Sequence, residues 1–135
     1  PPHVRLAQSQ LEYDQVTPVL RTLPLHQKLV LFSIKLNEEN GLRNISTGEV
    51  FRTYSDACLK ISVEPLTPRR ISSLLNELDT LGLIMARNVI KGRGGRSKQV
   101  NSAVPRGIDV ISTLSDSEAL VAQASEEKYA LQSRL

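Results

Sequence analysis

Residues 66–98 constrain the fold more than any other part of the chain. Thr67 can cap the start of a helix, and Pro68 fits the first helical position, where its missing N–H costs nothing. Gly82 supplies the left-handed residue that closes such a helix. Apolar residues recur at helical spacing between these bounds, at Ile71, Leu74, Leu75, Leu78 and Leu81. The stretch therefore predicts a helix over residues 68–81 with one face in a core.

A second helix start lies just upstream. Ser46 and Glu49 have the spacing of a capping box, and the helix predicted behind them continues to about Ile61. Residues 62–66 separate it from the next helix and contain a proline. Two helices joined by so short a turn predict a helix-turn-helix.

A further helix is predicted before this pair. Pro24 can occupy its first turn, and Gly41 marks its end. Its apolar stripe consists of Leu25, Leu29, Phe32 and Leu36. Residues 42–45 can add an edge strand, and residues 83–90 and 99–104 have the composition of two strands joined as a hairpin. Three helices and a terminal hairpin predict a winged helix-turn-helix, an α+β fold that is mostly helical.

The ends of the chain are expected to add helices to a winged-helix domain at residues 21–105. Residues 1–20 have helical spacing and are expected to form an arm that Pro18 kinks or ends. Residues 106–135 predict a short helix followed by a C-terminal helix or acidic tail. The short helix would pack through Ile108, Ile111 and Leu114. Because the chain opens on two prolines without an initiator methionine, we expect it to be part of a longer protein.

Length and composition limit the possible functions. A chain of 135 residues with 40% hydrophobic content fits one compact domain. Its apolar runs are far shorter than the roughly 20 residues that span a bilayer, so we expect a soluble, cytoplasmic, nucleoid-associated protein without a membrane partner. The single cysteine, Cys58, is expected to be a core thiol, and His3 and His26 are too few to indicate a metal site.

The sequence contains no recognisable catalytic motif. There is no phosphate-binding G-x-x-x-x-G-K-[ST] sequence and no nucleophile with a nearby base and orienting acid. The paired carboxylates Glu38-Glu39 and Glu126-Glu127 fall at predicted helix ends, where nothing would raise their pKa. We therefore expect a non-enzymatic chain with no catalytic residues, metal or cofactor of its own.

Positive charge is concentrated in one part of the chain. The net charge is +3, but residues 66–106 contain eight basic residues and two acids, which leaves the remainder net negative. On the helix 68–81, the side opposite the apolar stripe carries polar residues, with Arg70 at its flank. These polar residues are Arg69, Ser72, Ser73, Asn76 and Thr80. Such a distribution indicates a face that binds a polyanion.

The loop predicted at residues 91–98 has four basic residues and three glycines. Lysine and arginine side chains bind phosphates. Glycines let a backbone approach a surface closely, as a hairpin wing does along a DNA groove. Arg93-Gly94-Gly95 also matches the tripeptide of RNA-binding tails, but such tails repeat the unit in disordered sequence. A single copy in a predicted hairpin favours duplex DNA.

Several motifs of the chain occur together in one known family. They are Leu23–Leu31, Thr47–Val50 with Tyr54, Glu64–Ser72, Asn76–Asp79, Leu81–Ile84 and Lys91–Arg96. In this order they resemble the C-terminal winged-helix DNA-binding domain of archaeal replication initiators of the origin-recognition and cell-division-cycle type. The resemblance extends over residues 4–104.

The resemblance implies a function in replication initiation. It implies an AAA+ ATPase module upstream, which would use ATP and Mg²⁺ in the full-length protein and is absent from this chain. It also implies that the domain binds double-stranded origin DNA while the full protein helps to load the replicative helicase. The helix 68–81 would enter the major groove, and the wing 91–98 would reach the minor groove.

The same resemblance assigns the DNA-contacting residues. Those of the recognition helix are Thr67, Arg69, Arg70, Ser72, Ser73 and Asn76. Those of the wing are Lys91, Arg93, Gly94, Gly95, Arg96 and Lys98. Arg70 would contact phosphates, and the wing tip would comprise residues 93–96.

Two other functions fit a winged helix. The polar helix face could dock a protein, such as the upstream ATPase module or a helicase subunit. Alternatively, the domain could belong to a transcription regulator, which normally dimerises to read two half-sites. The chain shows no heptads for dimerisation, so we expect it to be monomeric.

Overall fold

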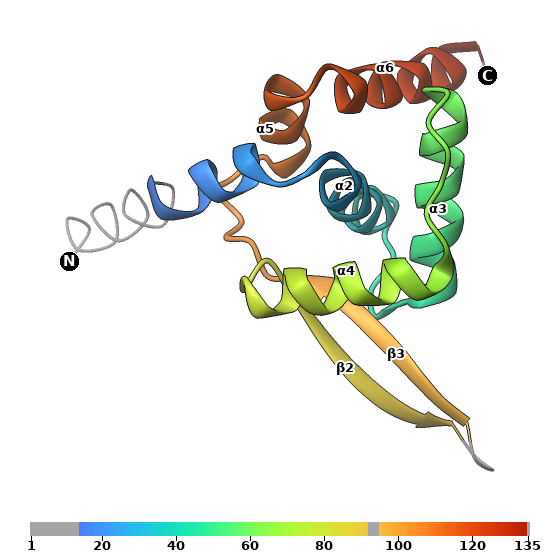
Figure 1. The fold of residues 1–135 in the computed structure, drawn as a ribbon. Coiled ribbons are helices and arrows are strands. Elements are labelled where there is room, and N and C mark those ends of the chain that lie inside the picture. The colour runs from blue at the N-terminus through green and yellow to red at the C-terminus, as the bar shows by residue number, and fades with distance from the viewer. Residues whose placement is uncertain (1–13, 92–94, 135) are drawn as a thin grey trace.

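A computed structural model describes residues 14–91 and 95–134 of the chain (Figure 1). Its elements in chain order are a helix at 14–22, α2 (Leu25–Glu39), β1 (Ile45–Ser46), α3 (Thr47–Lys60), α4 (Pro68–Thr80), β2 (Ile84–Lys91), β3 (Gly95–Ser102), α5 (Val110–Ser117) and α6 (Ala119–Arg134). The described strands form one antiparallel sheet in the order β1-β3-β2. The predicted fold class, a mostly helical α+β winged helix, is confirmed.

Helix α2 lies at the centre of the fold, with α3, α4, α5, α6 and β3 packed around it (Figure 1). The sequence predicted a single buried stripe, but Val30, Leu31 and Ile34 lie outside that stripe and are fully buried as well. The prediction was too narrow because neighbours cover several sides of this helix. Ser33 and Asn37 are also buried, and each donates a hydrogen bond to a carbonyl oxygen one turn earlier in the helix.

Helices α3 and α4 form the predicted helix-turn-helix. The Ser46 hydroxyl accepts a hydrogen bond from the Glu49 N–H at 3.2 Å, which caps α3 as the sequence predicted. The apolar stripe of α4 is buried, except that Leu81 is 50% exposed and was wrongly included. Helix α4 ends at Thr80, one residue earlier than predicted, and Leu81 is its C-cap. At about 100° per residue, Leu81 falls at the flank of the buried stripe, where the core does not cover it. Gly82 follows with φ +78°, the left-handed conformation expected of it.

The strands differ from their predicted bounds. The edge strand expected at 42–45 is instead Ile45–Ser46, because Gly41 and Asn44 adopt φ angles of +90° and +52°, which keep the preceding segment in a turn. Strand β3 begins at Gly95, four residues before the predicted 99, because the hairpin pairing continues from Ile84 opposite Ser102 to Lys91 opposite Gly95. The predicted loop at 91–98 is therefore mostly strand, and only residues 92–94 lie between the strands.

Helices at both ends of the chain contribute to the same core. The helix at 14–22 continues past Pro18, so of the two expected effects of this proline, an end of the helix is wrong. Leu20, in the same helix, is fully buried. The predicted short helix is α5, capped by Asp109, and its expected packing residues Ile108, Ile111 and Leu114 are buried. Of the two alternatives for the C-terminal segment, the structure has the helix, α6, which buries Val121 and Ala124. The domain boundaries at residues 20 and 105 remain predictions.

Two further expectations concern the core and the membrane. Cys58 is fully buried, so its assignment as a core thiol is confirmed, and burial raises the pKa of this thiol. In the part of the chain that the structure describes, no helix has both the length and the apolar character needed to cross a bilayer.

Candidate nucleic-acid interface

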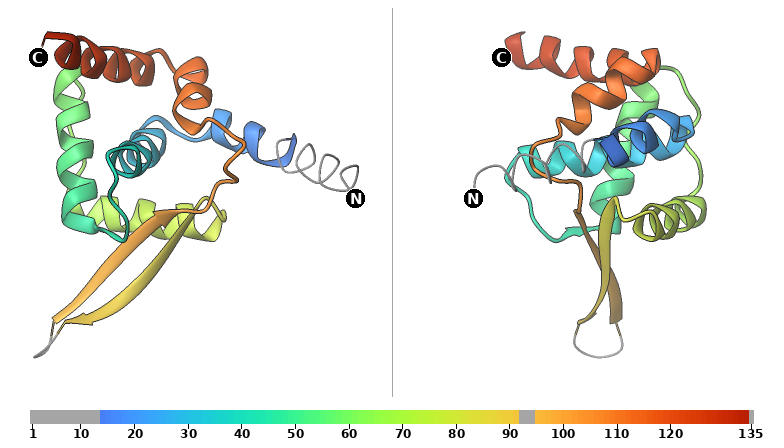
Figure 2. Two further views of the ribbon diagram at one scale, coloured as in Figure 1. Left: turned by 180° about the vertical axis from the view of Figure 1, so that it is seen from behind. Right: turned by 90° about the vertical axis from the view of Figure 1, so that its left-hand side faces the viewer.

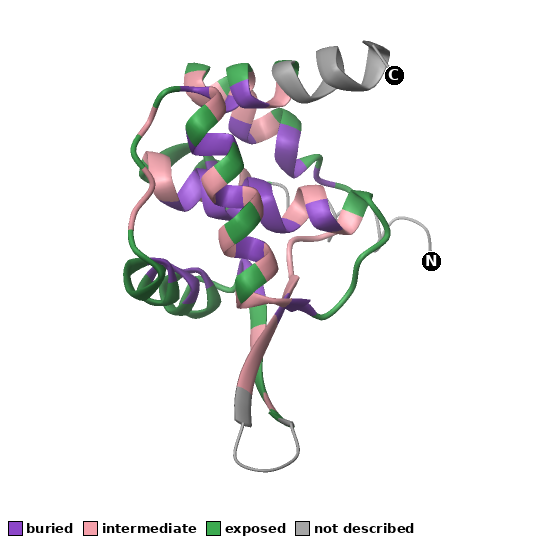
Figure 3. Cartoon of the chain, turned by 90° about the vertical axis from the view of Figure 1, so that its right-hand side faces the viewer, coloured by how far each residue is buried: buried purple, intermediate pink, exposed green. Residues whose placement is uncertain are grey.

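The first turn of α4 is presented to solvent. Thr67 accepts a hydrogen bond from the Arg70 N–H on its side-chain oxygen at 3.2 Å, so this candidate DNA contact is also the cap of the helix. Arg69 and Arg70 are both exposed. One face of α4 is buried and the other is exposed (Figure 3), and Ile71, Leu74, Leu75 and Leu78 make up the buried face.

The remaining predicted residues of α4 lie on the same outer side. Ser72, Ser73 and Asn76 are exposed, and Thr80 extends this face to the end of the helix. The Ser73 hydroxyl lies 3.5 Å from the Arg69 carbonyl oxygen, and the Thr80 hydroxyl donates to the Asn76 carbonyl oxygen at 3.0 Å. The structure thus brings the predicted residues of the recognition helix together on one polar surface.

Tyr54 of α3 fixes the entry to α4. Its hydroxyl oxygen accepts a hydrogen bond from the Leu66 N–H at 2.8 Å and lies 2.7 Å from Nδ1 of His26 in α2. Desolvation raises the Tyr54 pKa to about 12 and lowers the His26 pKa, so at neutral pH the tyrosine O–H can donate to an unprotonated Nδ1. One hydroxyl therefore joins α2, α3 and the residue before the helix cap.

This junction was not predicted from the sequence. Tyr54 was expected in the helix that begins after Ser46 and in a family motif, and His26 was expected to be a surface or packing residue, but no hydrogen bond was expected between them. The available signal was a tyrosine at a core position of a predicted helix, because a buried tyrosine hydroxyl needs a hydrogen-bond partner. A second link in the same region is the hydrogen bond that the Gln27 side-chain amide of α2 donates to the Glu77 carboxylate of α4.

The hairpin of β2 and β3 projects from the body of the domain beside α4 (Figure 2). Lys91 pairs with Gly95 and Ile90 with Arg96, so these three predicted wing residues, Lys91, Gly95 and Arg96, belong to the strands rather than to a loop. The other two predicted tip residues, Arg93 and Gly94, lie outside the described residues. The wing is therefore a longer β-ribbon than the sequence indicated.

Lys98 connects this wing to the recognition helix. Its ammonium nitrogen donates a hydrogen bond to the side-chain oxygen of Asn76 at 2.7 Å. The two residues are 22 positions apart in the sequence and were predicted separately as wing and helix contacts. The Lys98 side chain therefore reaches from β3 to the outer face of α4, so the two candidate elements meet at one surface.

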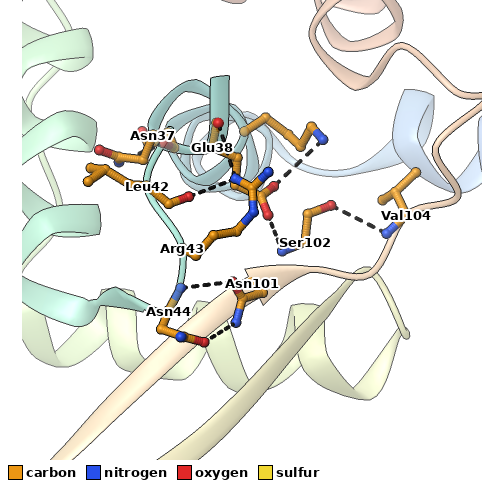
Figure 4. A network of polar contacts seen from close by, with 10 residues as sticks. Asn37, Glu38, Leu42, Arg43, Asn44, Asn101, Ser102 and Val104 are labelled. Carbon is orange, nitrogen blue, oxygen red and sulfur yellow. Dashed lines mark hydrogen bonds and ion pairs between the residues drawn. The ribbon is translucent and has the colours of Figure 1, made fainter. Parts of the chain in front are cut away.

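Polar contacts hold the base of the wing on the domain (Figure 4). Asn44 and Asn101 form a reciprocal pair, in which the Asn44 N–H reaches the Asn101 side-chain oxygen at 2.9 Å and the Asn101 amide donates to the Asn44 side-chain oxygen at 3.0 Å. The Glu38 carboxylate accepts from the Ser102 N–H at 3.3 Å. These contacts tie the end of β3 to the C-terminal end of α2 and to the loop before β1.

Among the described residues, the three exposed arginines of α4 and β2 form no ion pair with a carboxylate. The ion pairs found in this part of the chain join Lys35 to Glu38 and Arg52 to Glu49. Arg69, Arg70 and Arg87 are all exposed. Unpaired arginines on one surface can bind an anion without first breaking an internal salt bridge.

The helix-turn-helix, the exposed second helix and the adjoining β-hairpin define the winged-helix class of domains. The family model described as "CDC6, C terminal winged helix domain" matches residues 18–110, and the chain belongs to this family. The family suggested by the sequence motifs is therefore confirmed.

Relatives from archaea agree with this assignment. The chain is 49% identical over 115 residues to ORC1-type DNA replication protein 4 of Haloarcula marismortui, covering 85% of this chain and 22% of that protein. It is 50% identical over 98 residues to the ORC1-type DNA replication protein of Pyrococcus horikoshii, covering 73% of this chain and 23% of that protein. The chain thus spans less than a third of these relatives.

A solved structure has the same fold at substantial identity. The match is to the structure of the Aeropyrum pernix ORC1 protein in complex with DNA, with a TM-score of 0.81 and 40% identity, covering 91% of this chain and 31% of that chain. The Aeropyrum pernix ORC2 protein matches with a TM-score of 0.61 at 23% identity, covering 78% of this chain and 26% of that chain, which supports the fold alone.

Proposed function

We propose that this chain is a double-stranded DNA-binding module that places a replication initiator on origin DNA. The observation that carries the proposal is the Lys98–Asn76 hydrogen bond, because it joins the polar face of α4 and the basic β-hairpin into one surface. A helix fits the major groove of B-DNA, and a basic hairpin beside it can follow the backbone to the next minor groove. The match to an ORC1 protein solved with DNA supports the same function.

Each predicted residue has a part in this proposal. Arg69, Ser72, Ser73 and Asn76 face base edges in the major groove. Arg70 and Thr67, in the first turn, contact phosphates. Of the wing residues 91–98, those toward the tip approach the minor groove, with Arg93 and Gly94 at the tip, whereas Lys98 lies beside Asn76 at the major groove. The family supports the wider proposal that an AAA+ module in the full-length protein uses ATP and Mg²⁺ and that the initiator helps to load the helicase.

The affinity of the chain for duplex DNA, measured over a range of salt concentrations, tests this function. Each phosphate neutralised by a side chain contributes about −0.9 to the slope of log K against log salt concentration. Arg93→Ala should weaken binding to all duplexes and flatten the slope by about one unit. Arg69→Ala should cost roughly 1 to 3 kcal/mol, mainly on the preferred site.

Lys60→Ala is the matched control. It removes the same charge from the end of α3, where Lys60 lines a pocket of about 210 Å³ together with Ala124 of α6, away from the wing. This variant should bind duplex DNA like the unchanged chain. Weak duplex binding that none of the arginine substitutions alters would refute the proposal and favour a protein-binding winged helix.

A further inference from the structure

The contact between Lys98 and Asn76 fixes the orientation of an amide that is central to the proposed interface. A lysine ammonium carries three N–H donors and no acceptor, so the atom 2.7 Å from it must be the oxygen of the asparagine amide. The amide nitrogen is consequently turned away from Lys98.

The pair sits where it can reach a base edge. Asn76 is exposed on the outer face of α4, one turn beyond Ser72 and Ser73. Lys98 is half-buried on β3, on the same side of the strand as the buried Val100, which is the side that faces the domain. Within the described residues, no protein acceptor takes a hydrogen bond from the Asn76 amide nitrogen, so its two N–H donors remain available for a ligand.

The fixed orientation restricts which base the pair can read. An unrestrained asparagine reads adenine by accepting from the N6 amino group on its oxygen and donating to N7. In this chain the oxygen already faces an ammonium, so the adenine amino group would be brought against a full positive charge. Guanine instead presents two acceptors, N7 and O6, on its major-groove edge.

We propose that Lys98 and Asn76 together present only hydrogen-bond donors to one base of the bound duplex, and that they thereby select guanine and reject adenine at this position. This inference rests on the proposed DNA-binding function and deepens it. The ammonium and the amide nitrogen both supply N–H donors to the guanine edge. Lys98 is thus a specificity-determining residue as well as a source of charge.

A simpler role for Lys98 gives a different result. If the ammonium only contacts a phosphate, its removal lowers the affinity for every sequence equally and leaves the base preference unchanged. If it orients Asn76, its removal frees the amide to turn, and adenine becomes acceptable at one position. Base preference at that position therefore separates the two roles.

The experiment is selection of duplexes from a randomised pool by the chain, followed by sequencing. Asn76→Ala identifies the position that Asn76 reads, as the one whose base preference disappears. At this position the unchanged chain should prefer guanine over adenine by about tenfold or more. Lys98→Met keeps the aliphatic stem but removes the donors, and it should raise adenine to at least the level of guanine.

Two variants serve as controls. Lys98→Arg retains charge and donors and should keep the guanine preference. Arg70→Met removes one charge from the flank of the same helix and should lower affinity while leaving the preference intact. Thermal unfolding of each variant establishes that it is folded at the selection temperature.

The possible failures are distinguishable. Three results would overturn the inference and leave the proposed duplex binding intact. The unchanged chain could select adenine, Asn76→Ala could leave the base preference at every position unaltered, or Lys98→Met could keep the preference for guanine. Failure of the unchanged chain to bind any duplex would overturn the proposed function and the inference with it.

Discussion

The recognition helix and the wing are held in place by different means. Helix α4 is capped by Thr67, buries four apolar side chains and is joined to α2 and α3 through Tyr54 and Gln27. The wing is attached at its base by Asn101 and to α4 by Lys98, whereas Met85 and Ile90 of β2 are 66% and 81% exposed. The helix is therefore part of the core that stabilises the domain, and the outer half of the wing is available to serve binding alone.

The largest expected effect comes from the buried face of α4. Leu75 is fully buried, so Leu75→Ala should reduce the free energy of unfolding by about 2 to 5 kcal/mol through lost burial and the resulting cavity. Ile90→Ala, in the outer part of β2, should change it by no more than about 0.5 kcal/mol. Urea denaturation of both variants measures the difference. Equal losses would show that the wing stabilises the domain as much as the helix does.

The next effect comes from the junction before α4. Tyr54→Phe removes the hydroxyl that accepts from the Leu66 N–H and should cost about 1 to 3 kcal/mol in the free energy of unfolding, because the partly buried N–H loses its partner. The same substitution should weaken duplex binding, since the junction positions the start of α4. Phe51→Leu, at a partly buried neighbour that carries no hydroxyl, is the control for packing. A Tyr54→Phe variant as stable as the unchanged chain would show that the Tyr54 hydroxyl does not stabilise the start of α4.

A smaller effect is expected at the helix cap. Thr67→Ala removes the oxygen that accepts from the Arg70 N–H and should cost about 1 kcal/mol in the free energy of unfolding. Thr80→Ala at the other end of α4 removes only a hydroxyl that bonds back to the helix, and its cost should be near zero. If Thr67→Ala and Thr80→Ala lower the free energy of unfolding equally, the Thr67 cap does not specifically stabilise the start of α4.

The smallest effect is a dependence of stability on pH. Burial lowers the pKa of His26 below its ordinary value of 6.5, so the unfolded state binds more protons than the folded state between the two pKa values. The contribution to stability is complete above 6.5 and is lost as the pH falls from 6.5 through the lowered pKa. Tyr54 stays protonated throughout, since its pKa is raised to about 12. His26→Gln should flatten the pH dependence measured by urea denaturation, and an unchanged profile would contradict this assignment.

The sequence predicted α4 well because local signals specify it. The cap, the N-terminal proline, the apolar stripe and Gly82 are all properties of neighbouring residues, and the structure differs by a single residue at the C-terminal end. The wing was predicted less well because its length depends on pairing between β2 and β3, and the glycines of 92–95 suggested a loop where pairing already begins at Gly95.

The contacts that join the two elements could not be predicted from local patterns. The Lys98–Asn76 bond spans 22 positions and the Gln27–Glu77 bond spans 50, so both depend on how the chain is folded in space. Burial on several sides of α2 has the same origin, because its neighbours range along the chain from α3 to α6. Charge and helical spacing were enough to select the candidate residues, but tertiary packing determines which of them meet.

Hydroxyl-radical footprinting of a bound duplex tests most directly whether α4 and the wing form one DNA-binding surface. If they form one surface, two neighbouring segments of the duplex should be protected. In Arg93→Ala the protection at the minor groove contacted by the wing should disappear, while the segment flanking α4 should stay protected. A single protected segment that is insensitive to Arg93→Ala would contradict the account.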